Sequence, residues 1–328
     1  MFFRAVTKGG IAVPIFEYFS FADLWSPVFL VAVLAVILVY ALAVGPWRHR
    51  FPGSEPVPAK RQTAFVIGML LLYLAQGGPL SLLAHIMFTF HMTSMAVSYM
   101  FAPPLIIYGI PAWMWRWAFD RPFWRPFRFL MNPFICLVLF LLLFSLYHVP
   151  EVHDGIMVRY ALHAAFYAVL FVAAVMFWWH VASPVPEWNR LTPLRKLGYV
   201  FMSGVLLTPA CALIIFAGEP MYAVYSDPLV WVRAIGYCVA GDTTVLLRET
   251  GGPAFFSLLD PLEDQQLGGI VMKLLQEGVN VIALYMIFTA WYRSERDKDG
   301  EETDGRFPGG VPGGLGRLAG GEPQDGMA

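Results

Sequence analysis

Two histidines and two methionines lie close together in a hydrophobic stretch of the chain, between residues 73 and 104. At about 100° per residue, His85, His91, Met92 and Met95 fall on one face of a helix, within an arc of about 120°. Imidazole and thioether groups on one face are a ligand set that suits Cu(I). The alternative is ordinary packing, because methionine fills gaps in apolar helices. The pattern therefore indicates a candidate copper site and leaves packing open.

These residues belong to a sequence with the composition of a polytopic membrane protein. Hydrophobic residues make up 58% of the chain, charged residues make up 14%, and the mean hydropathy is +0.60. The net charge of −1 gives no indication of nucleic-acid binding. Apolar windows of about 20 residues can cross a bilayer as helices. We therefore predict an all-α transmembrane bundle with seven spans, at Trp25–Val44, Thr63–Leu80, Ala84–Ile110, Phe127–Tyr147, Val158–Ala182, Lys196–Ala217 and Gly268–Tyr292.

Lysines and arginines alternate between the connections of these spans. They are frequent after the first, third, fifth and seventh spans and rare in the other connections. The positive-inside rule then predicts that the N-terminus lies outside and the C-terminus lies in the cytoplasm. Tryptophans that cluster at the predicted inner interface, such as Trp113, Trp115 and Trp117, favour the same orientation.

The predicted topology divides the chain into three parts. We expect residues 1–24 to form an external N-terminal segment and residues 25–292 to form the membrane domain, with a further external segment at 218–267. Residues 293–328 are rich in glycine, proline and charge, so we expect a disordered cytoplasmic tail. Pro228–Ala240 is too short for an eighth span and contains Arg233, so we expect an interfacial or re-entrant helix there.

Prolines and glycines predict two local features of the second and third spans. The Gly77-Gly78-Pro79 sequence should form a tight hairpin between these spans. Pro103-Pro104 should kink or end the third span, because proline removes a backbone donor from a helix. Ala41-Leu42-Ala43 resembles a signal-peptidase site, but Glu17 and Asp23 precede it, and we expect the first span to be retained.

Five of the seven histidines fall on the predicted outer side of the membrane. Imidazoles inside a span are functional candidates by default, because ionisable groups are costly in lipid. For those in the outer loop, the alternative is that loops simply carry polar residues. The five are His85 and His91 of span three, His148 at the end of span four, His153 in the following loop, and His163 about one turn inside span five.

Other polar groups are candidates for supporting roles. Asp154, next to His153, can orient an imidazole by accepting its second N–H group. In span seven, Met272, Gln276 and Asn280 recur every four residues, and Lys273 with Glu277 forms an i, i+4 pair. This line is either a polar seam between helices or part of a metal path.

Nothing in the sequence indicates an enzyme or a thiolate metal trap. Cys136, Cys211 and Cys238 are isolated, without the Cys-x-x-Cys spacing of soluble copper chaperones. A pairing of Cys211 with Cys238 has no support beyond a shared predicted side. A phosphate loop, a nucleophile–histidine–acid pattern and a His-Glu-x-x-His zinc motif are all absent from the sequence.

Several short motifs follow one another in an order that resembles a known family, and together they extend from the second to the seventh span. They are Leu72-Tyr73-Leu74-Ala75, Gly78-Pro79-Leu80, His91-Met92, Pro103-Pro104-Leu105, Gly109-Ile110-Pro111, His163 followed by Phe177-Trp178-Trp179, and the segment from Pro261 to Met272. In these motifs the chain is similar to the seven-span caa3-type cytochrome c oxidase assembly factors, the CtaG family of the Bacillus kind.

The resemblance implies a membrane factor that is needed to make an active haem–copper oxidase, at the stage of copper insertion. One position departs from the family pattern, because many members carry a second histidine where this chain has Met95. Methionine still suits Cu(I), weakens a Cu(II) site, and is also compatible with packing. The positions that match the pattern are His91, Met92, His163, Asp264, Gln265 and Met272.

The leading hypothesis is an assembly factor, and not an enzyme, in the bacterial plasma (inner) membrane. It would hold or pass Cu(I) at the outer leaflet, with His91, Met92, Met95, His163, His85 and Met272 as candidate ligands. Asp264, Gln265, Glu277, His153 and Asp154 would support them. Its expected partners are haem–copper oxidase subunits, a periplasmic copper donor and the lipid bilayer. The alternatives are a haem-b-type electron-transfer protein, with His91 and His163 as axial ligands, and a copper transporter.

Overall fold

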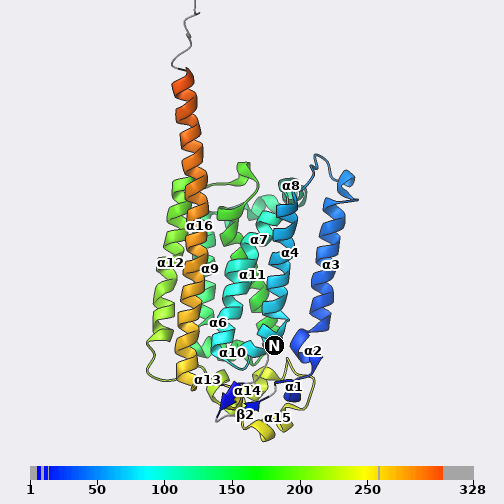
Figure 1. The fold of residues 1–328 in the computed structure, drawn as a ribbon, viewed down its shortest axis with the longest axis vertical. Coiled ribbons are helices and arrows are strands. Elements are labelled where there is room, and N and C mark those ends of the chain that lie inside the picture. Colours follow the sequence, from blue (N-terminus) through cyan, green and yellow to red (C-terminus); the bar gives the residue numbers. More distant parts are fainter. Residues whose placement is uncertain (1–5, 9–10, 14, 258, 306–328) are drawn as a thin grey trace, which may run out of the picture.

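The long helices of the protein run side by side in one bundle (Figure 1). A computed structural model of the chain describes residues 6–8, 11–13, 15–257 and 259–305. The strands β1 (Val6–Lys8) and β2 (Ile11–Val13) form a short antiparallel hairpin at one end of the bundle, which we call the cover end. The last helix, α16 (Pro261–Gly305), projects from the opposite end, which we call the tail end.

The other described elements are helices. In chain order they are α1 (Ile15–Tyr18), α2 (Phe21–Trp25), α3 (Pro27–Val44), η1 (Arg48–Arg50), α4 (Ala59–Gln76), α5 (Pro79–Ala84), α6 (Phe88–Ala96), η2 (Val97–Phe101), α7 (Ala102–Gly109), α8 (Ala112–Phe119), η3 (Pro122–Met131), α9 (Pro133–Tyr147), α10 (Pro150–Met157), α11 (Tyr160–Ala182), η4 (Pro186–Trp188), α12 (Pro193–Ile215), α13 (Ala223–Ser226), α14 (Pro228–Ile235), α15 (Thr243–Thr250) and η5 (Pro253–Phe255).

The prediction of an all-helical membrane bundle is confirmed in its main features. Among the described residues, five helical stretches are long and apolar enough to cross a membrane: Phe21–Val44, Phe88–Gly109, Tyr160–Ala182, Pro193–Ile215 and Pro261–Lys298. The pair η3–α9, which is bent by 71°, makes a sixth if it is one span. The remaining predicted span corresponds to α4, which packs against α3 and α7 and carries Lys60, Arg61 and Gln62 in its first turn. The count of seven spans stays a prediction.

The predicted third span, Ala84–Ile110, is divided in the structure. The chain turns at Gly77-Gly78 as expected, and the short helix α5 follows. A break at residues 85–87 then separates α5 from the continuous stretch formed by α6, η2 and α7. His85 therefore lies in the break, whereas His91 lies one turn inside α6.

The helix continues through Pro103-Pro104, so the predicted end at these prolines is wrong, while the predicted kink stays a prediction. A π-helical turn, η2, directly precedes the two prolines and changes the hydrogen-bond register there. Pro103 has no N–H group to give to the carbonyl of Tyr99, four residues earlier. The indole N–H of Trp178 donates to that carbonyl at 3.0 Å. The tryptophan of the Phe177-Trp178-Trp179 motif thus replaces the backbone donor that proline removes.

Helix α16 extends beyond Tyr292, where the predicted seventh span ends. It continues to Gly305, and Lys298 contacts Glu295 at 3.0 Å on its surface. The first part of the predicted tail is therefore helical. The rest of that tail, residues 306–328, and residues 1–5 of the predicted external segment lie outside the described residues.

Candidate functional site

The five histidines of the predicted outer side meet at the cover end of the bundle, although they come from α6, α11, α10, the end of α9 and the break before α6. The ring centroid of His91 lies 5.0 Å from that of His153 and 6.0 Å from that of His148. The rings of His85 and His163 lie 5.7 Å apart. We call these five residues the histidine cluster, and His91, His148 and His153 its inner group.

Hydrogen bonds define which ring nitrogen carries the proton in three of these histidines. The Nδ1 atom lies 2.8 Å from the Ser81 carbonyl in His85 and 2.7 Å from the Phe144 carbonyl in His148. In His153 it lies 3.3 Å from Oδ1 of Asp154. Carbonyl and carboxylate oxygens can only accept, so each Nδ1 atom donates a proton. Each Nε2 atom is then left with a free lone pair, as in a histidine that binds a metal.

Four of the five Nε2 atoms of this cluster are buried without hydrogen-bond partners. This is true, among the described residues, of Nε2 in His91, His148, His153 and His163. His91 is 1% exposed and His153 is fully buried. Buried polar atoms in folded proteins are almost always paired, and each exception needs an explanation. Four exceptions in one cluster, of which those of His148 and His153 are nitrogen lone pairs, suggest a shared ligand.

Burial keeps two imidazoles outside the spans, those of His148 and His153, in their neutral form. It lowers the pKa of His148 to about 3. Burial also lowers the pKa of His153, although the hydrogen bond to Asp154 acts in the opposite direction. Metal binding requires a neutral imidazole, so both residues are in the state that a metal would need at neutral pH.

Aromatic rings surround the cluster. The ring of Tyr147 lies 5.6 Å from His91 and 5.1 Å from His153, and its hydroxyl contacts the Tyr167 hydroxyl at 3.0 Å. Tyr167 in turn lies 4.0 Å from His163. These tyrosines connect the inner group with the His85–His163 pair.

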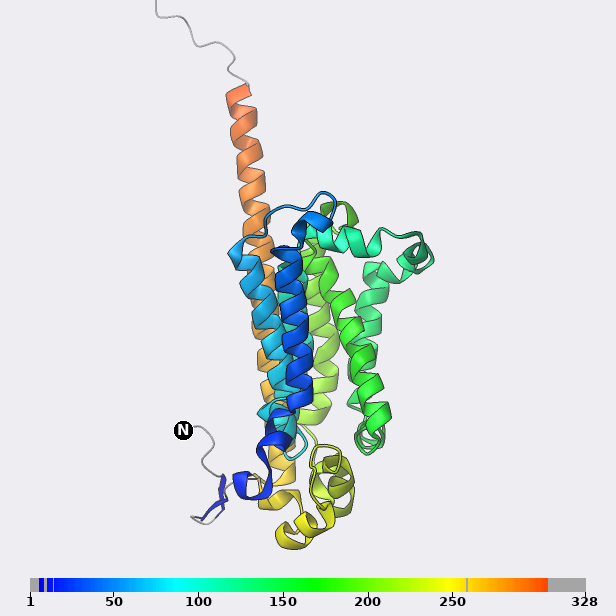
Figure 2. The same ribbon diagram turned by 90° about the vertical axis from the view of Figure 1, so that its right-hand side faces the viewer.

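The segment that was predicted to be external returns over the histidine cluster and closes it. We call residues 221–257, which contain α13, α14, α15 and η5, the cover; Figure 2 shows it beyond the ends of the long helices. Its side chains bond the backbone beside the histidines: the Tyr222 hydroxyl donates to the His148 carbonyl at 2.8 Å, and the Trp231 indole donates to the His85 carbonyl at 3.1 Å. The predicted helix at Pro228–Ala240 is α14, which ends at Ile235.

Asp154 joins the cover to the inner group. Its carboxylate contacts His153 and also accepts from the backbone N–H groups of Ala223, at 2.8 Å, and Val224, at 3.3 Å. The predicted role of Asp154 as an orienting group for an imidazole therefore fits its position.

The side chains of Asp264 and Gln265 accept hydrogen bonds from backbone N–H groups and do not face a histidine. Oδ2 of Asp264 accepts from the Phe88 N–H at 2.6 Å, and Oδ1 accepts from the Thr89 N–H at 3.2 Å. Both donors belong to the first turn of α6, so Asp264 caps the helix that carries His91. Gln265 accepts from the Met221 N–H at 2.7 Å, at the start of the cover.

The predicted sulfur ligands lie in the core. Met92, Met95 and Met272 are almost fully buried and share one hydrophobic cluster. Met157, which the sequence analysis did not single out, brings a sulfur to 3.3 Å from the Tyr147 hydroxyl. Thioether contacts to the histidines stay a prediction.

His91 and His163 contact different histidines. His91 faces His148 and His153, whereas His163 faces His85. Nothing in these contacts favours the two as axial ligands of one haem. Among the described residues, no three His, Cys, Asp or Glu side chains already stand in positions to hold one metal ion. A bound ion would therefore need the rings to turn.

Sequence reasoning missed several residues of the site. From the sequence, His148 lies at the end of span four and is not among the candidate ligands, whereas the structure brings it beside His91. Tyr147 of α9 and Tyr167 of α11 reach the histidines through the packing of these helices, and Tyr222 and Tyr225 reach them through the folded cover. None of the four had a sequence signal of its own.

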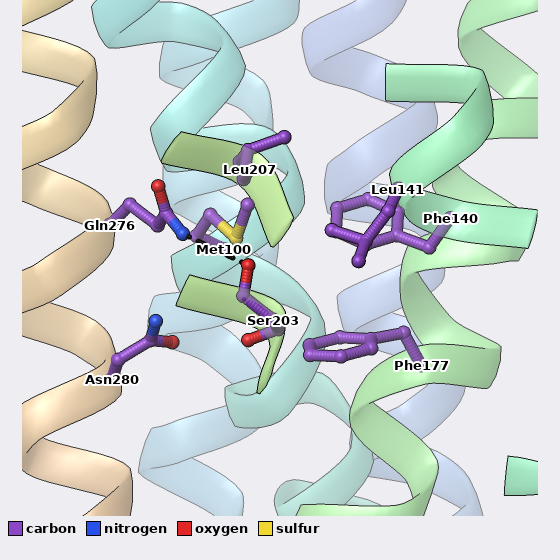
Figure 3. A pocket seen from close by; sticks show the side chains of 8 residues that line it. All are labelled: Met100, Phe140, Leu141, Phe177, Ser203, Leu207, Gln276 and Asn280. Carbon is purple, nitrogen blue, oxygen red and sulfur yellow. Dashed lines mark hydrogen bonds between the residues drawn. The ribbon is translucent and has the colours of Figure 1, made fainter. Parts of the chain in front are cut away.

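The polar line of span seven lies on α16 and is separate from the cluster. The Lys273 ammonium contacts Glu277 at 2.6 Å and Thr208 of α12 at 2.7 Å, which confirms the predicted i, i+4 pair. Figure 3 shows the space between Gln276, Asn280 and Ser203 on one side and Phe140 and Phe177 on the other. This space has no room for a water molecule. This packing favours a helix–helix seam over a path.

A match of the chain to a protein-family model indicates the function of this protein. The model for the cytochrome c oxidase caa3 assembly factor (Caa3_CtaG) matches residues 38–294, which is most of the chain. The chain belongs to the caa3 assembly factor family. No curated protein and no solved structure matches it.

The family match includes every residue of the site. The histidine cluster, the cover, Asp154 and the Asp264-Gln265 pair all lie inside the region shared with the caa3 assembly factors, whereas β1, β2 and the end of α16 lie outside it. The protein is therefore a membrane protein of a family that assembles cytochrome c oxidase.

Proposed function

We propose that this assembly factor holds Cu(I) in its histidine cluster and passes the ion to a nascent haem–copper oxidase subunit. The observation that carries the proposal is the group of four buried Nε2 atoms without partners, in His91, His148, His153 and His163. Imidazole nitrogens are good copper ligands, and Cu(I) accepts few ligands in flexible geometries.

Charge favours Cu(I) over a divalent ion at this site. The cost of burying an ion in an apolar environment rises steeply with its charge. The neutral imidazoles offer no compensating charge, and the carboxylate that contacts the cluster is Asp154, through His153. One negative charge balances one Cu(I) ion.

The imidazole nitrogens of the cluster do not yet converge on one point. Such an arrangement suits a protein that carries a metal ion better than one that holds it permanently. A site in which the rings must turn to bind the ion also releases it more readily. This property suits an assembly factor that delivers the ion to its oxidase, as we propose.

We further propose that the cover end faces the outside of a bacterial plasma membrane. Arg116 and Arg121 lie on or beside α8 at the tail end, and Arg48 and Arg50 lie in η1. The positive-inside rule assigns this basic end to the cytoplasm. Copper would then reach the cluster from a periplasmic donor.

Deletion of the protein in its own host tests the function. We expect the activity of the haem–copper oxidase and the copper content of the purified oxidase to fall, while copper-free quinol oxidases stay normal. Wild-type protein should restore both quantities, and His91→Ala should not. The control is His180→Ala, which removes another buried histidine near the opposite end of α11. Normal oxidase activity and copper content in the deletion strain would refute the proposal.

A further inference from the structure

The tail end of the bundle carries an open cavity that is separate from the histidine cluster. Its walls come from α8, from the two residues that follow this helix and from the turn between η1 and α4. Its volume of about 360 Å³ is within the range of small-ligand sites. The lining residues are Pro52, Gly53, Trp113, Arg116, Trp117, Asp120 and Arg121.

Ion pairs leave one positive charge at this cavity without a counterion. Nε and Nη2 of Arg116 donate to the Glu187 carboxylate at 2.6 Å and 3.1 Å. Asp120 lies 3.8 Å from Arg128, so its negative charge is also balanced. Arg121 makes no salt bridge within the part of the chain that the structure describes. The cavity therefore presents one unpaired guanidinium group.

Two tryptophans add a support and a second donor. The guanidinium of Arg121 lies over the ring of Trp117, 5.8 Å from its centroid, which holds the cation at the cavity. Trp113 is 7% exposed, and its buried indole N–H has no acceptor among the described residues. Buried donors are almost always paired, so this N–H is an independent indication that an acceptor binds here. A guanidinium group beside an N–H donor suits a phosphate.

The segment that follows the cavity is aromatic and basic and stays exposed. Helix η3 begins directly after Arg121, and all residues from 121 to 129 are exposed. Phe123 and Phe129 are 67% and 62% exposed. The axis of η3 is bent by 71° from that of α9, and Figure 2 shows the chain leaving the bundle sideways here. Such a segment across the end of a membrane bundle is typical of one that lies in the headgroup layer.

We propose that the cavity binds the phosphate of one anionic phospholipid, and we call it the lipid site. Arg121 recognises the charge, and the exposed phenylalanines of η3 contact the acyl chains beside it. A headgroup whose only charge is its phosphodiester matches the single unpaired guanidinium. A zwitterionic headgroup brings a cation of its own, which Arg121 repels. The lipid site depends neither on copper nor on the direction in which the bundle crosses the membrane.

Native mass spectrometry of the full-length protein in detergent tests the proposal. The probes are phosphatidylglycerol and phosphatidylcholine with the same acyl chains. We expect the wild type to bind one phosphatidylglycerol at least about tenfold more tightly than phosphatidylcholine, and Arg121→Gln to lose this preference. The matched control is Arg125→Gln, which removes a positive charge from η3 outside the cavity lining. It should change the affinity about twofold at most, because an isolated exposed charge contributes little.

Photolabelling of the wild type covers the case in which Arg121→Gln fails to fold. Phosphatidylglycerol with a photoreactive group on its headgroup should label peptides that contain residues 113–121. Unlabelled phosphatidylglycerol should prevent this labelling. Glycerol 3-phosphate should compete at least about tenfold more weakly, because it lacks the acyl chains that the apolar side chains contact.

Four outcomes would overturn the lipid site. Equal binding of the two lipids would show that the phosphate charge is not recognised. Equal losses in Arg121→Gln and Arg125→Gln would mean that the basic segment attracts lipids without a defined site. Labels confined to other peptides would place the lipid elsewhere. Glycerol 3-phosphate that competes as well as the lipid would make the ligand a soluble phosphate.

Discussion

At the scale of single residues, the site depends on which nitrogen of each imidazole is free. The Ser81 and Phe144 carbonyls and the Asp154 carboxylate each accept from an Nδ1 atom, so the Nε2 atoms of His85, His148 and His153 are available as ligands. Of these acceptors, only Asp154 is a side chain, and it can therefore be changed without touching a histidine.

Replacing Asp154 by asparagine should weaken Cu(I) binding about 10- to 100-fold, because groups that orient a ligating histidine have effects of this size. The carboxylate that fixes the His153 ring and balances the ion would be lost. Glu151→Gln is the control, since Glu151 is an exposed carboxylate on the same helix, α10. Chelator competition measures both affinities, and equal losses in the two variants would argue against an orienting role.

Burial of neutral histidines should also make the stability of the metal-free protein depend on pH. The pKa of His148 falls from an ordinary 6.5 to about 3 in the folded protein, and that of His153 is lowered as well. The unfolded chain therefore takes up protons first as the pH falls, and stability is lost progressively from about pH 6.5 downward. Tm in detergent should decrease over this range, and His148→Phe should reduce the decrease. A Tm that stays constant to about pH 4 would contradict the assignment.

At the scale of elements, hydrogen bonds from two other helices hold the helix that carries His91. Asp264 of α16 caps the first turn of α6, and Trp178 of α11 bonds the carbonyl that Pro103 leaves without its backbone donor. Both contacts join segments that are far apart in the sequence. The motif residues Asp264 and Trp178 thus position α6 without facing a histidine.

Trp178→Phe should lower the free energy of unfolding by about 1–3 kcal/mol more than Trp179→Phe, because it leaves the buried Tyr99 carbonyl without a donor. The two tryptophans are adjacent and both buried, so the loss of side-chain volume is similar. Denaturant unfolding in detergent measures the difference. Equal destabilisation of the two variants would mean that the hydrogen bond contributes little.

The sequence predicted the elements better than it predicted their contacts. Apolar length identified the helices, and the Lys273–Glu277 spacing predicted an ion pair that the structure contains. The continuation of the helix through Pro103 could not be predicted, because its replacement donor, Trp178, lies on another span. The same reason applies to His148, which meets His91 from another span, and to Tyr222 and Tyr225, which reach the site only because the cover folds back over it.

At the scale of the whole molecule, the two ends of the bundle carry different segments. The cover end holds the histidine cluster and its cover, whereas α16 projects from the tail end (Figure 1). This asymmetry matches the function we propose only if the cover end faces the periplasm, where the copper donor and the growing oxidase site would meet it.

Reporter fusions test this orientation. A fusion after Arg293 should report a cytoplasmic location, because α16 carries this residue at the tail end. A fusion within the cover should report an external location, since few basic residues occur there. The opposite pair of results would invert the bundle and remove the periplasmic donor from the account.

The central claim is that the chain itself binds Cu(I) through the inner group, and copper analysis of the purified wild type and His91→Phe tests it most directly. His180→Phe is the control, because His180 is equally buried and also lacks partners among the described residues, but lies in the last turn of α11. We predict nitrogen-bound Cu(I) in the wild type and in His180→Phe, and at least about a tenfold loss of affinity in His91→Phe. A wild type without copper, or a His91→Phe variant that binds as the wild type does, would contradict the account.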